Sequence, residues 1–342
     1  MSRARSAIER ITRGAVMLIG LMAGAVLQPS GVRAEVGEVR IAYQHSMSFL
    51  VVDVMIARKM IEARAAAAGL GPIAVSAVRF SSGPAANDAL VKGEVEVGGA
   101  GLAPFIDLWQ RTRGGANVRA VAPINDSPLY LITTDPRIRS AKDFTASDKI
   151  AVPAPGSIQG VFVRILAERA HGNPGALDAS MANMTSLDAL KALAAGDSGV
   201  RSYAGSIPFN VPAMALSGAR ELATSYAVLG GAHNLVALFV AEKFKTENPK
   251  TFAAIAGAID DAIAFIKSNP NETAEIFSAA SKGATPPEQV LAVLGRPDVA
   301  YDATPRGTMA FATFMLKTGA LKALPASWKD LYWENAHERN GS

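Results

Sequence analysis

Short apolar runs alternate with longer amphipathic stretches along the first half of the chain. Residues 38–43 alternate weakly and predict a strand, and residues 73–80, rich in β-branched side chains, predict a second strand. Between them, four apolar side chains fall on one face of a predicted helix: Phe49, Val52, Ile56 and Met60. A turn leads to a predicted helix over residues 85–92. Strands separated by helices at this spacing indicate a parallel sheet in an α/β fold.

The pattern restarts after residues 125–128, so a second α/β unit begins near residue 126. Before this point, residues 95–98 and 118–124 predict a third and a fourth strand. After it, the predicted elements are strands over residues 129–133, 150–152 and 234–240 and helices over residues 161–170, 252–266 and 286–294. Residues 221–226 and the glycines at 230–231 mark the end of the second unit. Two α/β units followed by helices indicate two lobes.

An internal repeat supports two related halves. Asp88-Ala89-Leu90 precedes a glycine and then the segment G-L-A-P-F at residues 101–105. Asp188-Ala189-Leu190 precedes a glycine and then G-S-I-P-F at residues 205–209. Each copy is typical of a helix ended by glycine, a strand, and a proline that begins the next helix.

The first 34 residues have the three zones of a secretory signal peptide. Arginines precede the apolar run at residues 14–27, and the segment ends in Val32-Arg33-Ala34. A run of 14 residues is shorter than the roughly 20 that span a membrane. These 34 residues contain five arginines and one glutamate, which accounts for the net charge of +4 of the whole chain. The mature chain is therefore neutral, and no electrostatic footprint for nucleic acid remains.

The composition argues against an enzyme. There is no cysteine, which excludes disulfides, thiolate metal sites and a cysteine nucleophile. The four histidines lie apart from one another, without metal-ligand spacing: His45, His171, His233 and His337. No G-x-S-x-G motif occurs. We therefore expect no catalytic residues, no metal and no cofactor, and an exported chain without cysteine fits a bacterial periplasm.

The stretch V-P-A-P-G-S-I-Q-G at residues 152–160 predicts a ligand contact. It joins a short strand to a helix through a glycine-bearing turn, and Ser157 stands at the N-cap. The unpaired N–H groups of such a helix start attract an anion or a polar head group. His45, in the loop after the first strand, is equally a surface imidazole or a ligand contact. Arg79 either attracts an anion or pairs with a carboxylate.

Five segments together resemble a known family. They are E-V-R-I-A-Y at 38–43, A-x-K-M-I-E at 57–62, F-S-S-G-P with A-L-V-K-G-E-V-E-V-G within 80–98, I-A-V-P-A-P-G-S at 150–157, and A-S-W-K-D-L-Y-W at 326–333. In order and spacing these are similar to the nitrate, sulfonate and taurine class of periplasmic substrate-binding proteins of ABC transporters. The resemblance implies a type II periplasmic binding protein fold, with two lobes, each a mainly parallel sheet flanked by helices, and a ligand cleft between them.

The resemblance also implies where each lobe begins and ends in the sequence. The segments that cross between the lobes fall near residues 125–128 and 226–234. Lobe 1 then comprises residues 35–125 and 229–342, including the C-terminal helices, and lobe 2 comprises residues 126–228.

In that family the ligand is held by loops at the carboxyl ends of strands. Carried over to this chain, the loop residues are Ser46, Ser82, Gly83, Gly101, Leu102, Gly156, Ser157 and Gln159, with Tyr203 and Ser206 closing from the second lobe. His45 and Asp126 complete the candidate set. An apolar tail of the ligand would pack on Met47, Phe49 or Leu102. Many relatives have an aspartate in a V-D-A-like segment where this chain has residues 200–203, so the resemblance does not identify the ligand.

The resemblance implies a monomeric receptor that delivers a small anion, such as a sulfonate, nitrate or a related organic acid, to an ABC permease. Two other classes stay open. One is a pyrimidine-precursor, thiamine-related binding protein or enzyme on the same architecture, which turnover of a bound ligand would reveal. The other is a ligand-binding component of a sensor, which neighbouring permease and ATPase genes would argue against.

Overall fold

The first two strands pair in parallel, as predicted. The computed structural model describes residues 35–196 and 199–342, so the predicted signal peptide at residues 1–34 lies outside the described residues. β1 (Glu38–Tyr43) and β2 (Ala74–Arg79) lie in register, and β1 also bridges Val97 in parallel.

The connection between β1 and β2 is built from two helices where the sequence predicts one. A 3₁₀ turn, η1 (Met47–Phe49), leads to α2 (Leu50–Ala57) and α3 (Met60–Ala67). The break falls at Lys59, which takes the left-handed conformation with φ 49°. After β2, α4 (Gly83–Lys92) begins two residues earlier than predicted, because Ser82 caps it and Pro84 occupies its first turn.

A second sheet of the same half has the order β3-β10-β4, and both of its pairs are antiparallel. β10 (Asn234–Val240) lies in the centre with all seven residues buried, between β3 (Gly98–Gly101) and β4 (Arg119–Asp126). β3 starts where the predicted third strand ends. Its glycines are required by packing, since a Cβ on Gly98 would lie 2.1 Å from the Phe239 ring. α5 (Leu102–Thr112) follows β3 directly.

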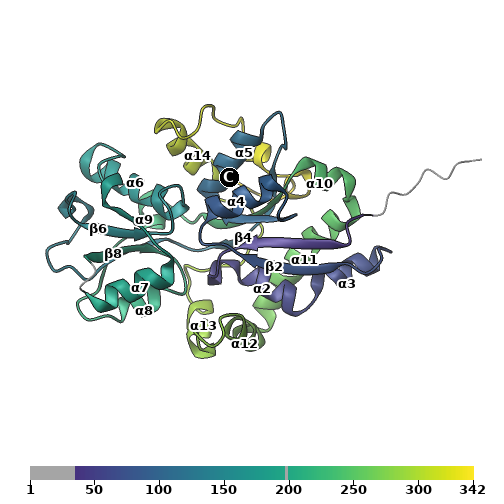
Figure 1. Ribbon diagram of the computed structural model, residues 1–342, viewed down its shortest axis with the longest axis horizontal. Helices are drawn as coiled ribbons and strands as arrows, with labels where there is room; N and C mark the ends of the chain where they lie inside the picture. The colour runs from purple at the N-terminus through teal and green to yellow at the C-terminus, as the bar shows by residue number, and fades with distance from the viewer. Residues whose placement is uncertain (1–34, 197–198) are drawn as a thin grey trace, which may run out of the picture. The chain divides into compact units, whose positions relative to one another are not determined.

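The second half holds a five-stranded sheet of order β7-β6-β8-β5-β9. Its strands are β5 (Tyr130–Thr133), β6 (Lys149–Val152), β7 (Met181–Asn183), β8 (Val200–Gly205) and β9 (Arg220–Thr224). Its helices are α6 (Ile158–His171), α7 (Ser186–Ala195), α8 (Asn210–Met214) and α9 (Ser225–Leu229). Figure 1 shows these helices around β6 and β8.

The sheets are mixed, which corrects the prediction of mainly parallel pairing. β6 runs parallel to β7 and β8, whereas β5 is antiparallel to β8 and β9. The antiparallel strands β5 and β10 each enter one sheet from the other, β5 after residues 127–129 and β10 after residues 225–233, which include α9. Because neither connection returns the chain to the sheet that it left, neither strand is held to the parallel direction that a crossover within one sheet imposes.

The two passages between the sheets, residues 127–129 and 225–233, lie against each other. The backbone N–H of Leu129 donates to Ser225 Oγ at 2.8 Å, and the N–H of Ser225 donates to the Leu129 carbonyl at 2.9 Å. Asp126 accepts hydrogen bonds from Asn234 and from Arg306. Hydrogen bonds between Leu129 and Ser225 thus join the two passages, and Asp126 is paired beside them.

The C-terminal part is helical, as predicted, and several of its helices begin at a proline. The helices are α10 (Glu242–Glu247), α11 (Pro249–Ser268), α12 (Pro270–Ala280), α13 (Pro287–Leu294) and α14 (Thr308–Lys317). Short 3₁₀ turns are η2 (Ala141–Asp143), η3 (Asp178–Ser180), η4 (Trp328–Leu331) and η5 (Glu334–Ala336). α11 packs on α2 and α3, and α12 packs on α2 and α13. Among the described helices, none is long and apolar enough to cross a membrane.

Candidate ligand-binding site

A cavity of about 320 Å³ lies at the carboxyl ends of six strands. Its wall is formed by the residues that follow β1, β2 and β3 in the first half and β6, β7 and β8 in the second half. The lining residues are Gln44, His45, Ser46, Ser48, Phe49, Arg79, Phe80, Ser81, Ser82, Gly83, Gly101, Pro104, Pro153, Ser157, Ile158, Gln159, Thr185, Ser186, Leu187, Ser206, Phe209, Leu235 and Val236. Ligands of open α/β sheets bind at such strand ends.

Four helices of ten or more residues begin at this cavity: α4 and α5 from one half, α6 and α7 from the other. Ser82, Ser157 and Thr185 cap three of them, each accepting a backbone N–H three residues ahead, at 3.1–3.4 Å. The first N–H groups of each helix have no partner within the helix, and each N-terminus carries partial positive charge. Both halves therefore direct positive helix ends at the same space.

The charged groups of the wall have the same sign as the helix ends. None of the described residues that line the cavity is an aspartate or glutamate, and Arg79 carries the full positive charge among them. Burial, and then the charge of Arg79, lowers the pKa of His45 from 6.5 to about 4, so its imidazole is neutral at pH 7. A space with this wall favours an anion.

Arg79, at the end of β2, is held without a carboxylate partner among the described residues. Its Nε donates to the hydroxyl of Tyr43 at 2.8 Å, and its guanidinium lies 5.8 Å from the centre of that ring. Its Nη2 donates to the carbonyl of Ala280 at the end of α12. These neutral partners fix the guanidinium and leave its charge available to a ligand.

The serine hydroxyls of the wall divide into two groups. Ser46 donates to the carbonyl of Ile207 at 2.8 Å, and Ser157 donates to the carbonyl of Ala154 at 2.6 Å. Their protons are therefore engaged within the protein, and Ser157 organises the start of α6. By contrast, the described residues offer no acceptor to the hydroxyl protons of Ser82 and Ser206. Free donors of this kind therefore face the cavity from both halves.

The structure brings eight of the twelve predicted site residues to this wall: His45, Ser46, Ser82, Gly83, Gly101, Ser157, Gln159 and Ser206. The other four do not line it. Leu102 begins α5, and its side chain is fully buried in the core. Asp126 is engaged with Asn234 and Arg306 at the crossing. Gly156 is exposed in the turn before α6. Tyr203 is fully buried, and a Cβ on Gly205 would lie 1.9 Å from its ring.

Several lining residues were absent from the predicted set. Thr185, Ser186 and Leu187 extend the site into α7, and the sequence carries a signal for them, because a threonine three residues before Asp188 is typical of a helix start. The apolar wall from Phe80, Phe209 and Leu235 has no comparable signal. Of the three residues expected to contact an apolar tail, Phe49 lines the cavity, whereas Met47 is buried beside it with no exposed surface.

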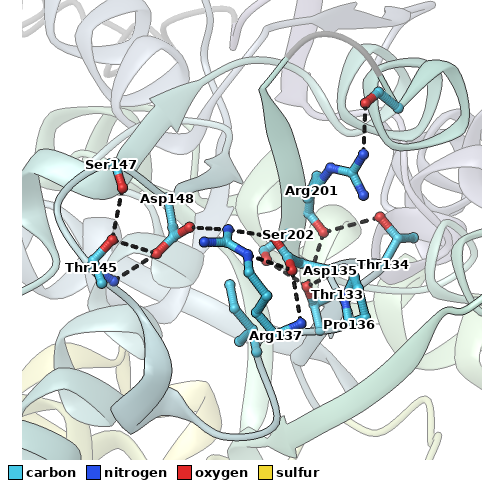
Figure 2. A network of polar contacts seen from close by, with 12 residues as sticks. Thr133, Thr134, Asp135, Pro136, Arg137, Thr145, Ser147, Asp148, Arg201 and Ser202 are labelled. Carbon is cyan, nitrogen blue, oxygen red and sulfur yellow. Dashed lines mark hydrogen bonds and ion pairs between the residues drawn. The ribbon is translucent and has the colours of Figure 1, made fainter.

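A second cavity, of about 380 Å³, lies at the opposite ends of β6 and β8. Figure 2 shows its polar network, in which Arg137 donates to Asp135 at 2.7 Å and to Asp148 at 2.9 Å. Hydrogen bonds from Arg137 lower the pKa of Asp135. Burial alone would raise the pKa of Asp148, but hydrogen bonds from Thr145 and Arg137 lower it overall. Arg137 thus links the two carboxylates and holds the loops together, so its charge is engaged within the protein. Within residues 35–196 and 199–342, no group of three or more side chains is arranged to hold a metal ion.

The chain is similar to a known protein family and to several solved structures. Residues 33–281 match the model of the NMT1-like family. No curated protein matches the chain.

Solved structures resemble the chain over most of its length. The alkanesulfonate-binding protein SsuA from Xanthomonas axonopodis pv. citri bound to MOPS is 19% identical, with a TM-score of 0.66 and coverage of 88% of this chain and 99% of that one. The aliphatic sulphonate-binding protein SsuA from Escherichia coli is 17% identical, with a TM-score of 0.65 and coverage of 88% and 93%. The nitrate-binding protein NrtA from Synechocystis PCC 6803 is 16% identical, with a TM-score of 0.67 and coverage of 86% and 84%. At these identities the likeness shows a shared fold, and it confirms the predicted periplasmic binding protein fold.

Proposed function

The chain belongs to the NMT1-like family, and we propose that it is a solute-binding protein that captures a small organic anion in the periplasm. It hands the anion to an ABC permease, acts as a monomer, catalyses no reaction, and is exported by a signal peptide cleaved after Ala34. The observation that carries the proposal is the convergence of four helix N-termini and Arg79 on a cavity whose described lining residues include no carboxylate.

The size and wall of the cavity favour an organic anion over nitrate. A water molecule occupies roughly 30 Å³, so a cavity of about 320 Å³ has room for about ten of them. A four-atom ion such as nitrate fills far less. Phe49, Phe80, Phe209 and Leu235 supply apolar surface for a body behind the anionic head. The sulfonate-binding neighbours support a sulfonate or a related organic acid.

A thermal-shift screen tests the proposal. A ligand that binds only the folded protein, at 100 times its dissociation constant, stabilises it by about 2.7 kcal/mol, which raises Tm by several degrees. We expect such a shift with at least one alkyl or aryl sulfonate or carboxylate and none with the matching uncharged amides. If amides and cations shift Tm while anions do not, the anion proposal fails. Conversion of the best ligand on prolonged incubation would instead support an enzyme.

We further propose that lobe 1 (residues 35–125 and 229–342) and lobe 2 (residues 126–228) close on the anion as units. Two of the contacts that cross between them at the cavity carry this proposal. Ser46 donates to the Ile207 carbonyl, and Gly101 lies so near Ile158 that an added Cβ would be 2.6 Å from its Cγ2 and 2.8 Å from its Cβ. Gly101 thus permits the starts of α5 and α6 to meet.

Gly101→Ala is therefore expected to weaken binding of the best anion by tenfold or more. Overpacking of this kind costs about 1–3 kcal/mol, and a tenfold change in affinity corresponds to about 1.4 kcal/mol. Calorimetric titration measures the loss. Adding Ile158→Ala to the variant should restore most of the affinity by removing the clashing side chain. Gly156→Ala is the matched control, since its Cβ would meet Pro84 at an ordinary 3.5 Å. Equal losses in the two alanine variants would contradict the role given to Gly101.

A further inference from the structure

One residue of the cavity wall contains a buried nitrogen without a hydrogen-bond partner. Several described residues contain a buried side-chain nitrogen or oxygen without a hydrogen bond, and among them only His45, through Nδ1, also lines the cavity. Buried polar groups in native proteins are nearly always hydrogen-bonded, so each exception calls for a physical explanation. His45 is thus a lining residue whose hydrogen-bonding capacity the described residues leave unused, and a partner for its ring can arrive with the ligand.

The ring that carries this atom is fixed in place. His45 stacks on Phe277 of α12, with ring centres 5.3 Å apart and planes inclined by 6°. Phe209 meets it edge-on, with ring centres 6.5 Å apart and planes inclined by 78°. Rotating the imidazole toward another protein acceptor or donor would break both contacts. His45 is thus held ready, in the manner of a preorganised recognition group.

The chemical state of His45 defines what it recognises. Burial and the neighbouring Arg79 lower its pKa to about 4, so at pH 7 it presents one N–H and one lone pair. A neutral imidazole adds no charge to hold the anionic head, which Arg79 and the helix starts already attract. It suits a neutral group that can both donate and accept a hydrogen bond, as a hydroxyl does.

We propose that His45 determines specificity by hydrogen bonding to a neutral polar group on the body of the solute, so that the preferred ligand is an organic anion with a hydroxyl group away from its anionic head. This inference rests on the proposed function. A site built to hydrogen-bond such a group rejects the analogue that lacks it, because the buried protein atom is then left unpaired.

Matched pairs of anions test the proposal by calorimetric titration. The pairs are 3-hydroxypropane-1-sulfonate with propane-1-sulfonate, 3-hydroxybutanoate with butanoate, and 4-hydroxybenzoate with benzoate. For at least one pair we expect the hydroxylated member to bind tenfold or more tightly to the wild-type protein. His45→Phe keeps a flat ring against Phe277 but removes both nitrogens, and it should bring the two members of that pair within about twofold.

The control variant is Ser82→Ala, which removes a free hydroxyl donor from the wall. If that donor serves the anionic head, both members lose affinity equally and their ratio is unchanged. Equal affinity for the members of every pair in the wild-type protein overturns the role of His45 and leaves the anion-binding proposal standing. A ratio that persists in His45→Phe overturns it as well. Failure of all six anions to bind, by contrast, counts against the proposed function itself.

A second readout needs no ligand. Because His45→Phe replaces an unpartnered buried nitrogen with carbon and keeps the stack on Phe277, it should raise Tm of the ligand-free protein. His45→Gln, which keeps a polar group but loses the ring, should lower Tm. A lower Tm for His45→Phe would show that the nitrogen is hydrogen-bonded in the free protein, and that result removes the observation on which the inference depends.

Discussion

Replacing Asp53 with asparagine is expected to stabilise the protein by about 4 kcal/mol at pH 8. Asp53 lies in α2 with 7% of its surface exposed, and its Oδ2 has no hydrogen-bond partner among the described residues. Burial raises its pKa from 3.8 to about 7, although the charge of Arg79 acts in the opposite direction. Each pKa unit corresponds to about 1.36 kcal/mol, so a shift of about three units gives this magnitude.

The sign of the effect follows from the direction of the shift. A folded-state pKa above the unfolded value of 3.8 means that the folded protein binds the proton more tightly. The stability associated with the protonated carboxyl is complete below pH 3.8 and is lost as the pH rises through about 7. Asparagine is neutral throughout, so its advantage in free energy of unfolding should shrink from about 4 kcal/mol at pH 8 to less than about 1 kcal/mol at pH 4.

Urea unfolding of both proteins at pH 4, 6 and 8 measures this dependence. Asp107→Asn is the matched control, because Asp107 is exposed in an ion pair with Arg111 one helical turn away, and such pairs contribute about 0.3–0.5 kcal/mol. The control should show no gain that grows with pH. A destabilised Asp53→Asn at pH 8 would mean that the folded protein stabilises the ionised carboxylate, contrary to its surroundings here.

The order of strands and helices could be predicted because each strand is a short apolar run bounded by glycine, proline or polar residues. The pairing direction could not. β10 lies between β3 and β4, more than a hundred residues earlier in the chain, and a local pattern contains no information on such distant neighbours. The helix break at Lys59 was missed for a related reason, since a lysine in the left-handed region has no local signal as a glycine would.

The location of the site could be predicted better than the direction of its side chains. Loops after strands and caps of helices can be read from the sequence, and these brought His45, Ser82, Ser157 and Ser206 to one cavity. Tyr203 illustrates the limit, because neighbouring strand residues point to opposite sides of a sheet and a shift of one residue reverses the assignment. The hydroxyl of Ser157 donates to a carbonyl of the protein, whereas that of Ser82 does not. This difference depends on acceptors that come near only when the chain is folded.

A second buried group, His233, is expected to make the protein less stable as the pH falls, which is opposite to the effect of Asp53. His233 is 1% exposed at the crossing between the sheets. Its Nδ1 lies 2.9 Å from the Asn234 carbonyl and its Nε2 lies 2.8 Å from Ser225 Oγ. A carbonyl only accepts, so Nδ1 carries the proton and Nε2 accepts from the Ser225 hydroxyl. Ser225 in turn accepts the backbone N–H of Leu129, and this chain of bonds joins the two passages in a form that requires a neutral ring.

Protonation of His233 would disrupt that chain, and burial lowers the pKa of the ring from 6.5 to about 4, even though the hydrogen bond to Asn234 acts to raise it. Because the folded pKa lies below the unfolded value, the stability due to the neutral ring is complete above pH 6.5. It is lost as the pH falls toward 4. At about 1.36 kcal/mol per unit, the loss is about 2 kcal/mol between pH 7 and pH 5 and about 3 kcal/mol by pH 4.

The difference in free energy of unfolding between the wild-type protein and His233→Gln should become smaller as the pH falls. At pH 7 the variant is expected to be less stable than the wild-type protein, because glutamine loses the edge-on ring contacts with Tyr226 and Phe311. On going to pH 5 only the wild-type protein has the titrating ring, so the difference should narrow by about 2 kcal/mol. His171→Gln, at an exposed position, is the matched control and should follow the wild-type profile. Parallel curves for wild-type and His233→Gln between pH 7 and pH 5 would show that the ring at the crossing accepts a proton without cost to the fold.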